Sequence, residues 1–364
     1  MPHSLYLHVP FCPKICPYCD FHKMRRNEGL VAAYLKRLHE EAETLHAEFP
    51  SELETLYFGG GTPSHLTDDE LALVVEMLQQ TWGFPGSKET TLEADPLTFD
   101  RARLETFRAL GFDRLSIGMQ STQDDVLKFL GRQHNGREGL NAVEMALEAG
   151  FTVSADIITA VPGQDAAKDL HALAQTGVPH ISVYNLTVEP NTPFARRGVR
   201  VDEDKEADDY VLTNEILSSY GLERYEVSSH ARPGFEAVHN RVYWQGEHFL
   251  ALGPAAASFV PAEGLLGERR TNPVIRDWLR GETPEVTVVG PLEYVQDVLM
   301  TGLRTMCGVD VAELSERSGI DVLGNFANEL SKSIGAGLLE HEGEFLRVTP
   351  KGLTQLNRVV SSFF

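Results

Sequence analysis

The sequence predicts an α/β fold from residue 4 to about residue 220. Short apolar runs rich in strand-forming residues alternate there with longer runs of helical periodicity. Repetition of this kind indicates parallel strands joined by right-handed crossovers. Six such units fit either a doubly wound sheet or a partial barrel. The predicted strands are Ser4–Val9, Glu54–Phe58, Thr90–Glu93, Arg114–Met119, Thr152–Ile158 and His180–Val188.

Helices are predicted between these strands and after the last one. Thr67 and Glu70 have the spacing of a capping box, in which each side chain bonds the backbone of the other. A glycine follows four of the predicted helices, at Gly83, Gly111, Gly150 and Gly221, where a left-handed C-cap is expected. The predicted helices are 28–48, 67–82, 99–110, 136–149, 165–176 and 203–220.

The rest of the chain predicts two further regions. Residues 222–290 lose the alternation and are rich in glycine and proline, which suggests a connecting region. Helical patterns return at 291–306, 310–317 and 321–335, followed by a hairpin around Gly343 and a last helix near Pro350. Helices followed by a hairpin resemble a winged-helix module. We therefore expect domains at 1–221, 222–290 and 291–364.

Composition narrows the class of function. A formal net charge of −21 over 364 residues argues against general nucleic-acid binding, which needs a basic surface. Simple solubility would also explain this charge. No signal peptide is visible at Met1–Leu5, and the longest uncharged apolar stretch, Phe249–Ala262, is short for a membrane span and contains prolines. We expect a soluble cytoplasmic protein.

The most informative motif holds three of the four cysteines, in Cys12-Pro13-Lys14-Ile15-Cys16-Pro17-Tyr18-Cys19. Thiolates suit iron–sulfur clusters, zinc or copper(I). Three ligands would leave one iron of a [4Fe–4S] cluster open to an exogenous ligand. Structural zinc usually needs two separated ligand pairs, and a disulfide would leave an odd cysteine. Cys307 lies in an apolar helical pattern and is expected to be a core residue.

This spacing resembles that of the radical S-adenosylmethionine (SAM) superfamily, as do the flanking segments Tyr6–Phe11 and Asp20-Phe21. The resemblance implies that Cys12, Cys16 and Cys19 hold a [4Fe–4S] cluster whose open iron binds the amino and carboxylate groups of SAM. It also places Tyr6 and Tyr18 among the cofactor-binding residues.

A run of three glycines, Gly59-Gly60-Gly61-Thr62-Pro63, follows the second predicted strand. Glycines expose the backbone and allow a ligand to approach closely, although a tight turn would explain the run equally well. After a three-cysteine loop it resembles the element of radical SAM proteins that bonds the methionyl amino group. The resemblance gives that role to Gly60, Gly61 and Thr62.

Polar residues near the ends of the later strands complete the predicted SAM pocket. Glu93 could accept hydrogen bonds from an ammonium or a ribose, although a solvated loop charge is the plainer interpretation. Gln120 could reach the ribose, and Arg132 could bind a carboxylate with two hydrogen bonds. Asp156 lies in an apolar run, and a buried carboxylate needs partners.

These motifs follow successive strands, and parallel α/β folds place their sites at the carboxyl edge of the sheet. Convergence from six strands favours the partial (β/α)6 barrel of radical SAM enzymes over a doubly wound sheet.

Further matches, including Ile181–Pro193, resemble the HemN/HemW family over nearly the whole chain. HemN members are oxygen-independent coproporphyrinogen III oxidases, and HemW members are haem-binding proteins thought to be haem chaperones. HemN-type enzymes carry a fourth cysteine where this chain has Phe21, and an extension ahead of the first strand, which here begins by Ser4. Both features favour HemW.

The segment His239-Asn240-Arg241-Val242-Tyr243-Trp244 matches the H-N-x-x-Y-W element of HemW proteins, which implies haem binding at His239. Imidazole is a common axial ligand of haem iron, and aromatic faces suit a porphyrin. We expect a flexible surface loop here, with His230 and His248 as the nearest alternative ligands. A structural loop with a hydrogen-bonded histidine is the other interpretation.

Two positions depart from the HemW pattern, which usually has Asn at Asp95 and Tyr-Gly-Leu-Pro at Thr159–Pro162. The resemblance implies a haem chaperone with haem, SAM and a [4Fe–4S] cluster, and haem-accepting proteins as partners. The alternative is a coproporphyrinogen III oxidase. Membrane-protein acceptors, a homodimer and enzymatic activity remain open.

Overall fold

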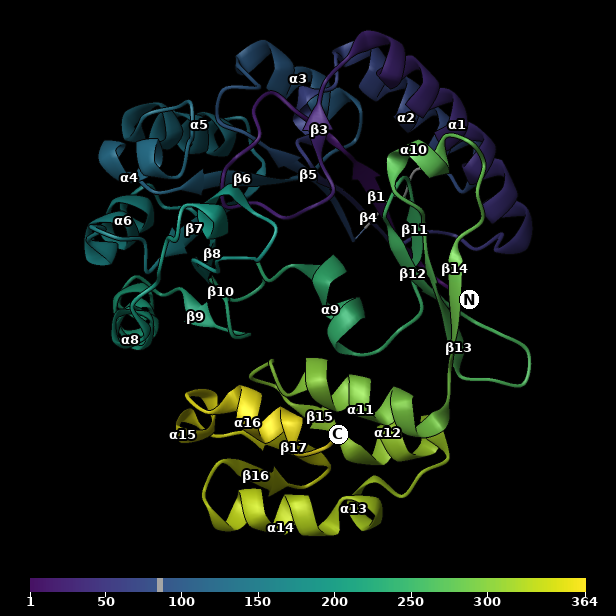
Figure 1. Cartoon of the computed structure of the whole chain (residues 1–364), viewed down its shortest axis with the longest axis vertical. Coiled ribbons are helices and arrows are strands. Elements are labelled where there is room, and N and C mark those ends of the chain that lie inside the picture. The colour runs from purple at the N-terminus through teal and green to yellow at the C-terminus, as the bar shows by residue number, and fades with distance from the viewer. Residues whose placement is uncertain (84–87) are drawn as a thin grey trace.

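The computed structural model describes residues 1–83 and 88–364 and is built around one curved sheet (Figure 1). In the described part of the chain this sheet has nine strands in the order β11-β1-β4-β5-β6-β7-β8-β10-β9. The strands from β11 to β8 are parallel, and β10 and β9 are antiparallel additions. Their bounds are Ser4–Val9 (β1), Thr55–Gly60 (β4), Glu89–Ala94 (β5), Arg114–Gln120 (β6), Thr152–Thr159 (β7), His180–Asn185 (β8), Glu223–Arg224 (β9), Ser229–Ala231 (β10) and Leu250–Leu252 (β11).

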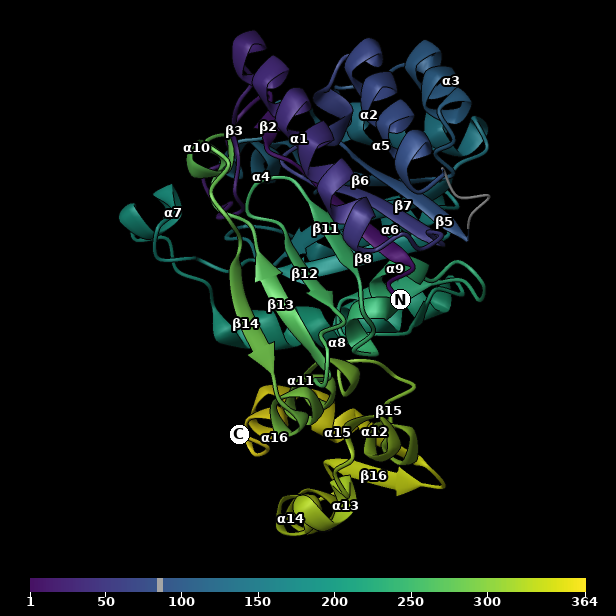
Figure 2. The same cartoon turned by 90° about the vertical axis from the view of Figure 1, so that its right-hand side faces the viewer.

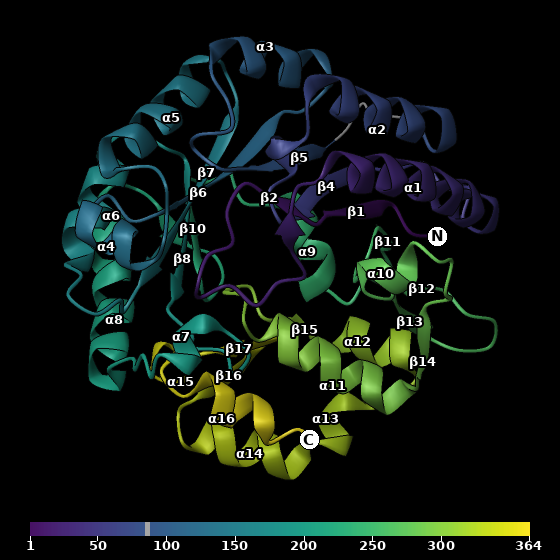
Figure 3. The same ribbon diagram turned by 45° about the horizontal axis from the view of Figure 1, so that its top comes forward.

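Helices form an arc around the outside of this sheet, and the cysteine loop crosses the open ring (Figure 3). The predicted partial barrel is therefore confirmed, although α4 and α7 were not foreseen. The helices are Glu28–Glu48 (α1), Asp68–Thr81 (α2), Arg101–Ala109 (α3), Asp124–Phe129 (α4), Gly136–Glu148 (α5), Ala166–Gln175 (α6), Pro193–Arg196 (α7) and Glu203–Ser219 (α8), with a 3-10 turn at Pro63–His65 (η1). Two short strands, Phe11–Cys12 (β2) and Met24–Arg25 (β3), pair beside the cysteine loop.

The predicted helix signals are confirmed. Thr67 accepts a hydrogen bond from the Glu70 amide, and the Glu70 carboxylate accepts one from the Thr67 amide. The four predicted C-cap glycines all adopt positive φ angles, between 73° and 94°. These signals depend on residues close in the chain, so the sequence alone places the helix ends within a few residues.

Alternation along the strands separates the helix-covered core from the barrel interior, because successive side chains point to opposite faces. On β6, Leu115, Ile117 and Met119 are fully buried in the main hydrophobic core. Ser116, between Leu115 and Ile117, and Gln120, at the end of the strand, line a cavity inside the barrel. The apolar positions thus hold the helices, and the polar positions are left for a site.

Residues 222–290 contain more regular structure than the predicted connecting region. The short strand β11 lies parallel to β1 and extends the barrel. A short helix, α9, lies at the base of the barrel (Figure 1). The remaining elements of this region are Val238–Trp244 (α9), Ala257–Val260 (β12), Gly267–Thr271 (β13), Ile275–Trp278 (α10) and Glu285–Val289 (β14), with β12, β13 and β14 forming a separate sheet.

The C-terminal residues form a unit with its own hydrophobic core below the barrel (Figures 1 and 2). The predicted hairpin around Gly343 is confirmed, while the last predicted helix is split in two. Its elements are Pro291–Gly302 (α11), Val309–Asp310 (β15), Val311–Ser318 (α12), Val322–Asn325 (α13), Ala327–Gly335 (α14), Leu339–Glu342 (β16), Phe345–Val348 (β17), Pro350–Leu353 (α15) and Leu356–Ser361 (α16).

The prediction that Cys307 is a core residue is wrong. Helix α11 ends at Gly302, and Cys307 lies in the turn that leads to β15, where it is exposed. The helix therefore stops before the cysteine, and the chain turns directly after it at Gly308, whose φ is 72°. No helix within the described residues has the length and apolarity needed to cross a membrane.

Candidate functional site

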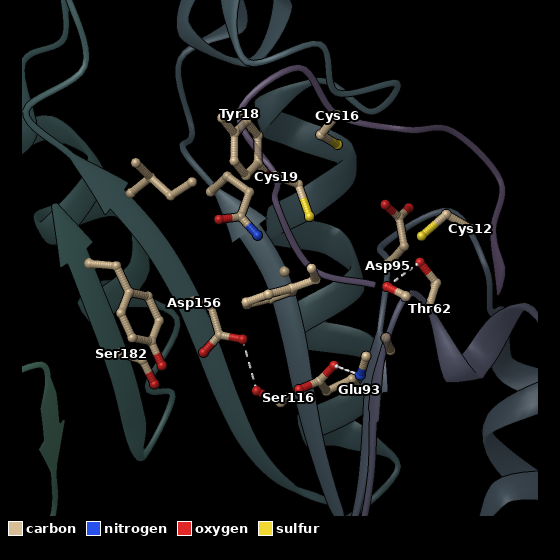
Figure 4. A pocket seen from close by; sticks show the side chains of 18 of the residues that line it. Cys12, Cys16, Tyr18, Cys19, Thr62, Glu93, Asp95, Ser116, Asp156 and Ser182 are labelled. Carbon is tan, nitrogen blue, oxygen red and sulfur yellow. Dashed lines mark hydrogen bonds between the residues drawn. The ribbon is translucent and has the colours of Figure 1, made fainter. Parts of the chain in front are cut away.

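A cavity of about 400 Å³ opens at the carboxyl ends of the barrel strands (Figure 4). Eleven of the residues predicted from the sequence line it. The cysteines lie at one end, and Glu93 and Asp156 lie deeper between the strands (Figure 4). These eleven residues are Cys12, Cys16, Tyr18, Cys19, Gly60, Gly61, Thr62, Glu93, Gln120, Arg132 and Asp156.

The cysteine loop brings three thiols to this cavity. Cys12 ends β2, and the loop turns at Cys16, whose carbonyl accepts a hydrogen bond from the Cys19 amide at 3.4 Å. Burial raises the pKa of the Cys12 thiol to about 11 and also raises that of Cys19. Cluster binding would therefore have to release protons, because the thiolate is the ligand.

No group of three His, Cys, Asp or Glu side chains within residues 1–83 and 88–364 is arranged to hold a single metal ion. Each cysteine of an iron–sulfur cluster binds a different iron, so cluster ligands stand farther apart than the ligands of one ion. Three soft thiols around one cavity fit a cluster by this criterion.

Gly60 is required by its surroundings. It is the last residue of β4, its φ is +111°, and a Cβ there would lie 2.5 Å from the ring of His8. At Gly61 a Cβ would lie 2.8 Å from the carbonyl carbon of Pro10. These two glycines let the end of β4 pack against the segment after β1 while their backbone faces the cavity.

Glu93 projects from β5 and is held by two donors. The Tyr57 hydroxyl donates to its Oε1 at 2.9 Å, and the Gly60 amide donates to its Oε2 at 3.0 Å. Burial raises the pKa of Glu93 to about 7 despite these bonds. A cationic ligand group would favour the ionised form. The solvated loop charge that we considered is excluded.

Asp156 occupies β7 with similar support. The Ser116 hydroxyl donates to its Oδ2 at 2.8 Å, and burial raises the pKa of Asp156 to about 6. The expectation that this carboxylate has partners is confirmed by Ser116 and, at 3.5 Å, by Ser154.

Gln120 and Arg132 complete the rim. Gln120 lies at an irregularity of β6 with a φ of 65°, which turns its side chain into the cavity lining. Arg132 Nη2 donates to Asp95 Oδ2 and to the Gly118 carbonyl, both at 2.7 Å. The acid at position 95, where relatives are expected to have Asn, thus forms an ion pair with this arginine.

Sequence reasoning missed part of the lining. Thr91, Arg114 and Tyr184 also line the cavity. Arg114 Nη2 and Thr91 Oγ1 are buried without a hydrogen-bond partner among the described residues. The available signal for these three residues was their polarity, since each is a polar residue at an inward-facing position of an otherwise apolar strand.

Tyr6 is not brought to the cavity lining. Its hydroxyl lies 3.0 Å from His8 Nδ1, and the His8 ring lies beneath Gly60. Tyr6 therefore supports the end of β4 indirectly, through its contact with His8.

His239 also lies outside the lining, although its neighbours Ala237 and Asn240 belong to it. The expected flexible surface loop is wrong, because His239 is the second residue of helix α9 and is fully buried. Its Nδ1 lies 2.8 Å from Thr55 Oγ1 and its Nε2 lies 2.6 Å from the Tyr243 hydroxyl. Burial lowers its pKa to about 3, so the ring is neutral.

The alternative haem ligand His230 is buried as well, and its Nε2 accepts a hydrogen bond from Arg224 at 3.3 Å. His248 is only partly buried and has one bonded ring nitrogen, which lies 2.8 Å from the Leu266 carbonyl.

The fold and this arrangement define a class. The radical SAM superfamily matches residues 6–176, which include the three cysteines and the predicted SAM contacts, and the HemN C-terminal domain matches residues 290–354. The superfamily match implies a [4Fe–4S] cluster and SAM as cofactors.

Two relatives narrow this class to a family. The heme chaperone HemW of Lactococcus lactis is 30% identical over all of this chain and 97% of its own length. HemW of Synechocystis is 35% identical over 86% of this chain and 81% of its own. This chain belongs to the HemW family. The coproporphyrinogen III oxidase HemN of Escherichia coli shares the fold, with a TM-score of 0.86, 23% identity and coverage of all of this chain and 90% of that one.

Proposed function

We propose that this protein is a haem chaperone that carries a SAM-ligated [4Fe–4S] cluster and passes haem to acceptor proteins. The observation that carries this proposal is the convergence of three cysteines and the predicted SAM contacts on one cavity, in a chain similar along its length to proteins named heme chaperones.

In this proposal Cys12, Cys16 and Cys19 hold the cluster. Gly60, Gly61 and Thr62 offer backbone and hydroxyl groups to the methionyl end of SAM, and Arg132 pairs with its carboxylate. Glu93, Gln120 and Asp156 bond its amino group and ribose. A bound cluster and SAM would supply one-electron chemistry.

Tyr18 and Tyr6, the two remaining predicted cofactor contacts, have different roles in this proposal. Tyr18 lines the cavity within the cysteine loop and would cover the cofactors. Tyr6 would act through His8, by supporting the glycine that faces SAM. A direct haem contact at His239 remains a prediction, and haem ligation there would have to replace one of its two side-chain hydrogen bonds.

The proposal is tested with anaerobically reconstituted protein. Haemin should bind with a saturating absorption change, and the loaded protein should transfer haem to an apoprotein such as apomyoglobin. The same preparation, given coproporphyrinogen III, SAM and a reductant, should form no protoporphyrinogen. Efficient turnover in that assay would overturn the chaperone proposal and favour the oxidase.

A further inference from the structure

An ion pair between Asp95 and Arg132 lies in the cavity that contains the three cysteines. Asp95 directly follows β5, Arg132 follows α4, and both residues line the cavity. Figure 4 shows Asp95 at the cysteine end. Arg132 Nη2 donates to Asp95 Oδ2 at 2.7 Å, and the side chains of Asp95 and Arg132 are only 17% and 11% exposed. Since both are largely buried, this pair is less screened than an ion pair on the surface.

We infer that Asp95 competes with the carboxylate of SAM for Arg132 and thereby limits the affinity of this protein for SAM. The inference rests on the proposed function, in which Arg132 binds that carboxylate. It gives a role to Asp95, which has none in that proposal. The observations that carry it are the donors that Arg132 has left and the bonds that hold Asp95.

The hydrogen-bond donors of Arg132 are unevenly used. Nη2 donates to Asp95 and to the Gly118 carbonyl, both at 2.7 Å, so both of its protons are engaged. Nη1 lies 3.7 Å from Cys16 Sγ, and Nε is buried without a partner among the described residues. A guanidinium binds a carboxylate with two parallel bonds along one of two edges, Nη1–Nη2 or Nε–Nη2, and both edges include Nη2. Binding of SAM with two such bonds therefore requires that Nη2 lose one of its present acceptors.

Asp95 is the acceptor that can be displaced. Gly118 lies within β6, so its carbonyl moves only with the strand. The Asp95 carboxylate is on a side chain and can turn away from Arg132. Its charge also opposes an incoming carboxylate, because like charges at one site repel each other. The contact of Nη1 with Cys16 places the guanidinium beside the proposed cluster, where SAM is bound.

Three other cations line the same cavity, Lys14, Lys23 and Arg114. Arg114 is the first residue of β6, at the end of the strand away from the cysteines, and it pairs with Glu89 at 3.4 Å. A lysine binds a carboxylate as a point charge, whereas the planar fork of arginine matches both carboxylate oxygens. The carboxylate of SAM is therefore expected at Arg132.

The test is a titration of the anaerobically reconstituted full chain with SAM, followed by the EPR spectrum of the reduced cluster. Asp95→Asn removes the competing charge and should raise the affinity for SAM about tenfold. Asp95→Ser should also raise it, and its hydroxyl can still accept the bond from the Leu97 amide that Asp95 Oδ1 accepts at 3.0 Å. Asp95→Glu keeps the charge and should bind SAM no more tightly than the wild type. Arg132→Gln should weaken SAM binding about tenfold.

Decarboxylated SAM distinguishes competition for the carboxylate from a general change in the cavity. Because this probe has no carboxylate, Asp95→Asn should bind it no more tightly than the wild type does. The matched control is Asp68→Asn, since Asp68 Oδ1 accepts a hydrogen bond from Arg103 Nε at 3.0 Å and neither residue belongs to the cavity lining. This control should bind SAM as the wild type does.

The outcomes separate this inference from the proposed function. Equal or weaker SAM binding by Asp95→Asn and Asp95→Ser would overturn the inference, and so would unchanged binding by Arg132→Gln. An equal gain in affinity for SAM and for decarboxylated SAM would also overturn it, because that gain would not depend on the carboxylate. The expected SAM affinities together with failed haem transfer by the wild type would support this inference and remove only the chaperone proposal.

Discussion

The imidazole ring of His239 lies nearly parallel to the phenol ring of Tyr57, with centroids 5.3 Å apart and planes inclined by 29°. The Tyr57 hydroxyl donates to Glu93, which lines the cavity that contains the three cysteines. The residue that opens the H-N-x-x-Y-W element is therefore separated from that cavity by a single side chain. Its contacts are structural in this conformation.

Replacing His239 by alanine should destabilise the protein. The change removes two side-chain hydrogen bonds and a stacked ring from a fully buried position. We expect a loss of about 2–4 kcal/mol in the free energy of unfolding, measured by chemical denaturation of the apoprotein. The exposed His3 provides the control, since His3→Ala should change stability by less than about 0.5 kcal/mol. Equal stability of the two variants would contradict the structural role.

Replacing Cys16 by alanine should abolish the cluster. With two of three ligands left, reconstitution should give little bound iron, whereas the wild type should carry about four irons per chain. Iron content and the EPR spectrum of the reduced protein provide the measurement, and SAM should perturb the wild-type spectrum. The exposed Cys307 is the control, because Cys307→Ala should leave the iron content unchanged. A cluster that still forms when all three loop cysteines are replaced would refute their assignment as its ligands.

Replacing Gly60 by alanine should disturb the SAM side of the cavity. The added methyl group would meet the ring of His8 at 2.5 Å, and the positive φ alone costs about 1–3 kcal/mol for a non-glycine residue. We expect weaker SAM binding by titration and a lower melting temperature. Gly221→Ala has a positive φ but no atom within 4 Å of its Cβ, so it measures the backbone cost alone. SAM affinity should fall only in the first variant.

The raised pKa of Glu93 predicts a dependence of stability on pH. Its value in the folded protein is about 7, against 4.5 ordinarily, so the folded state binds this proton more tightly than the unfolded state does. The resulting stabilisation is complete below pH 4.5 and is lost as the pH rises through 7. In the wild type this titration should lower the free energy of unfolding by up to about 3 kcal/mol between pH 5 and 8, and Glu93→Gln should remove that decline. Parallel stability curves for the two proteins would exclude this titration.

Local signals in the sequence were sufficient for most of the barrel. The capping box at Thr67 and the C-cap glycines depend on residues within one helical turn, and strand alternation depends on nearest neighbours. The cysteine loop and Gly60 could be placed for the same reason, because each motif is contiguous. The site residues then lie together at one edge of the sheet, because parallel strands bring their carboxyl ends together.

What the sequence could not determine were contacts between distant segments. His239 is buried through Thr55, which precedes it by 184 residues, and Arg132 is paired with Asp95, 37 residues before it. The three residues of β11 are too few to carry a strand pattern, and only pairing with β1 makes them part of the barrel. The sequence by itself determined the barrel and its cysteine loop, because those follow from periodicity and spacing. Tertiary structure decided that His239 holds α9 in place, because hydrogen-bond partners depend on which segments fold together.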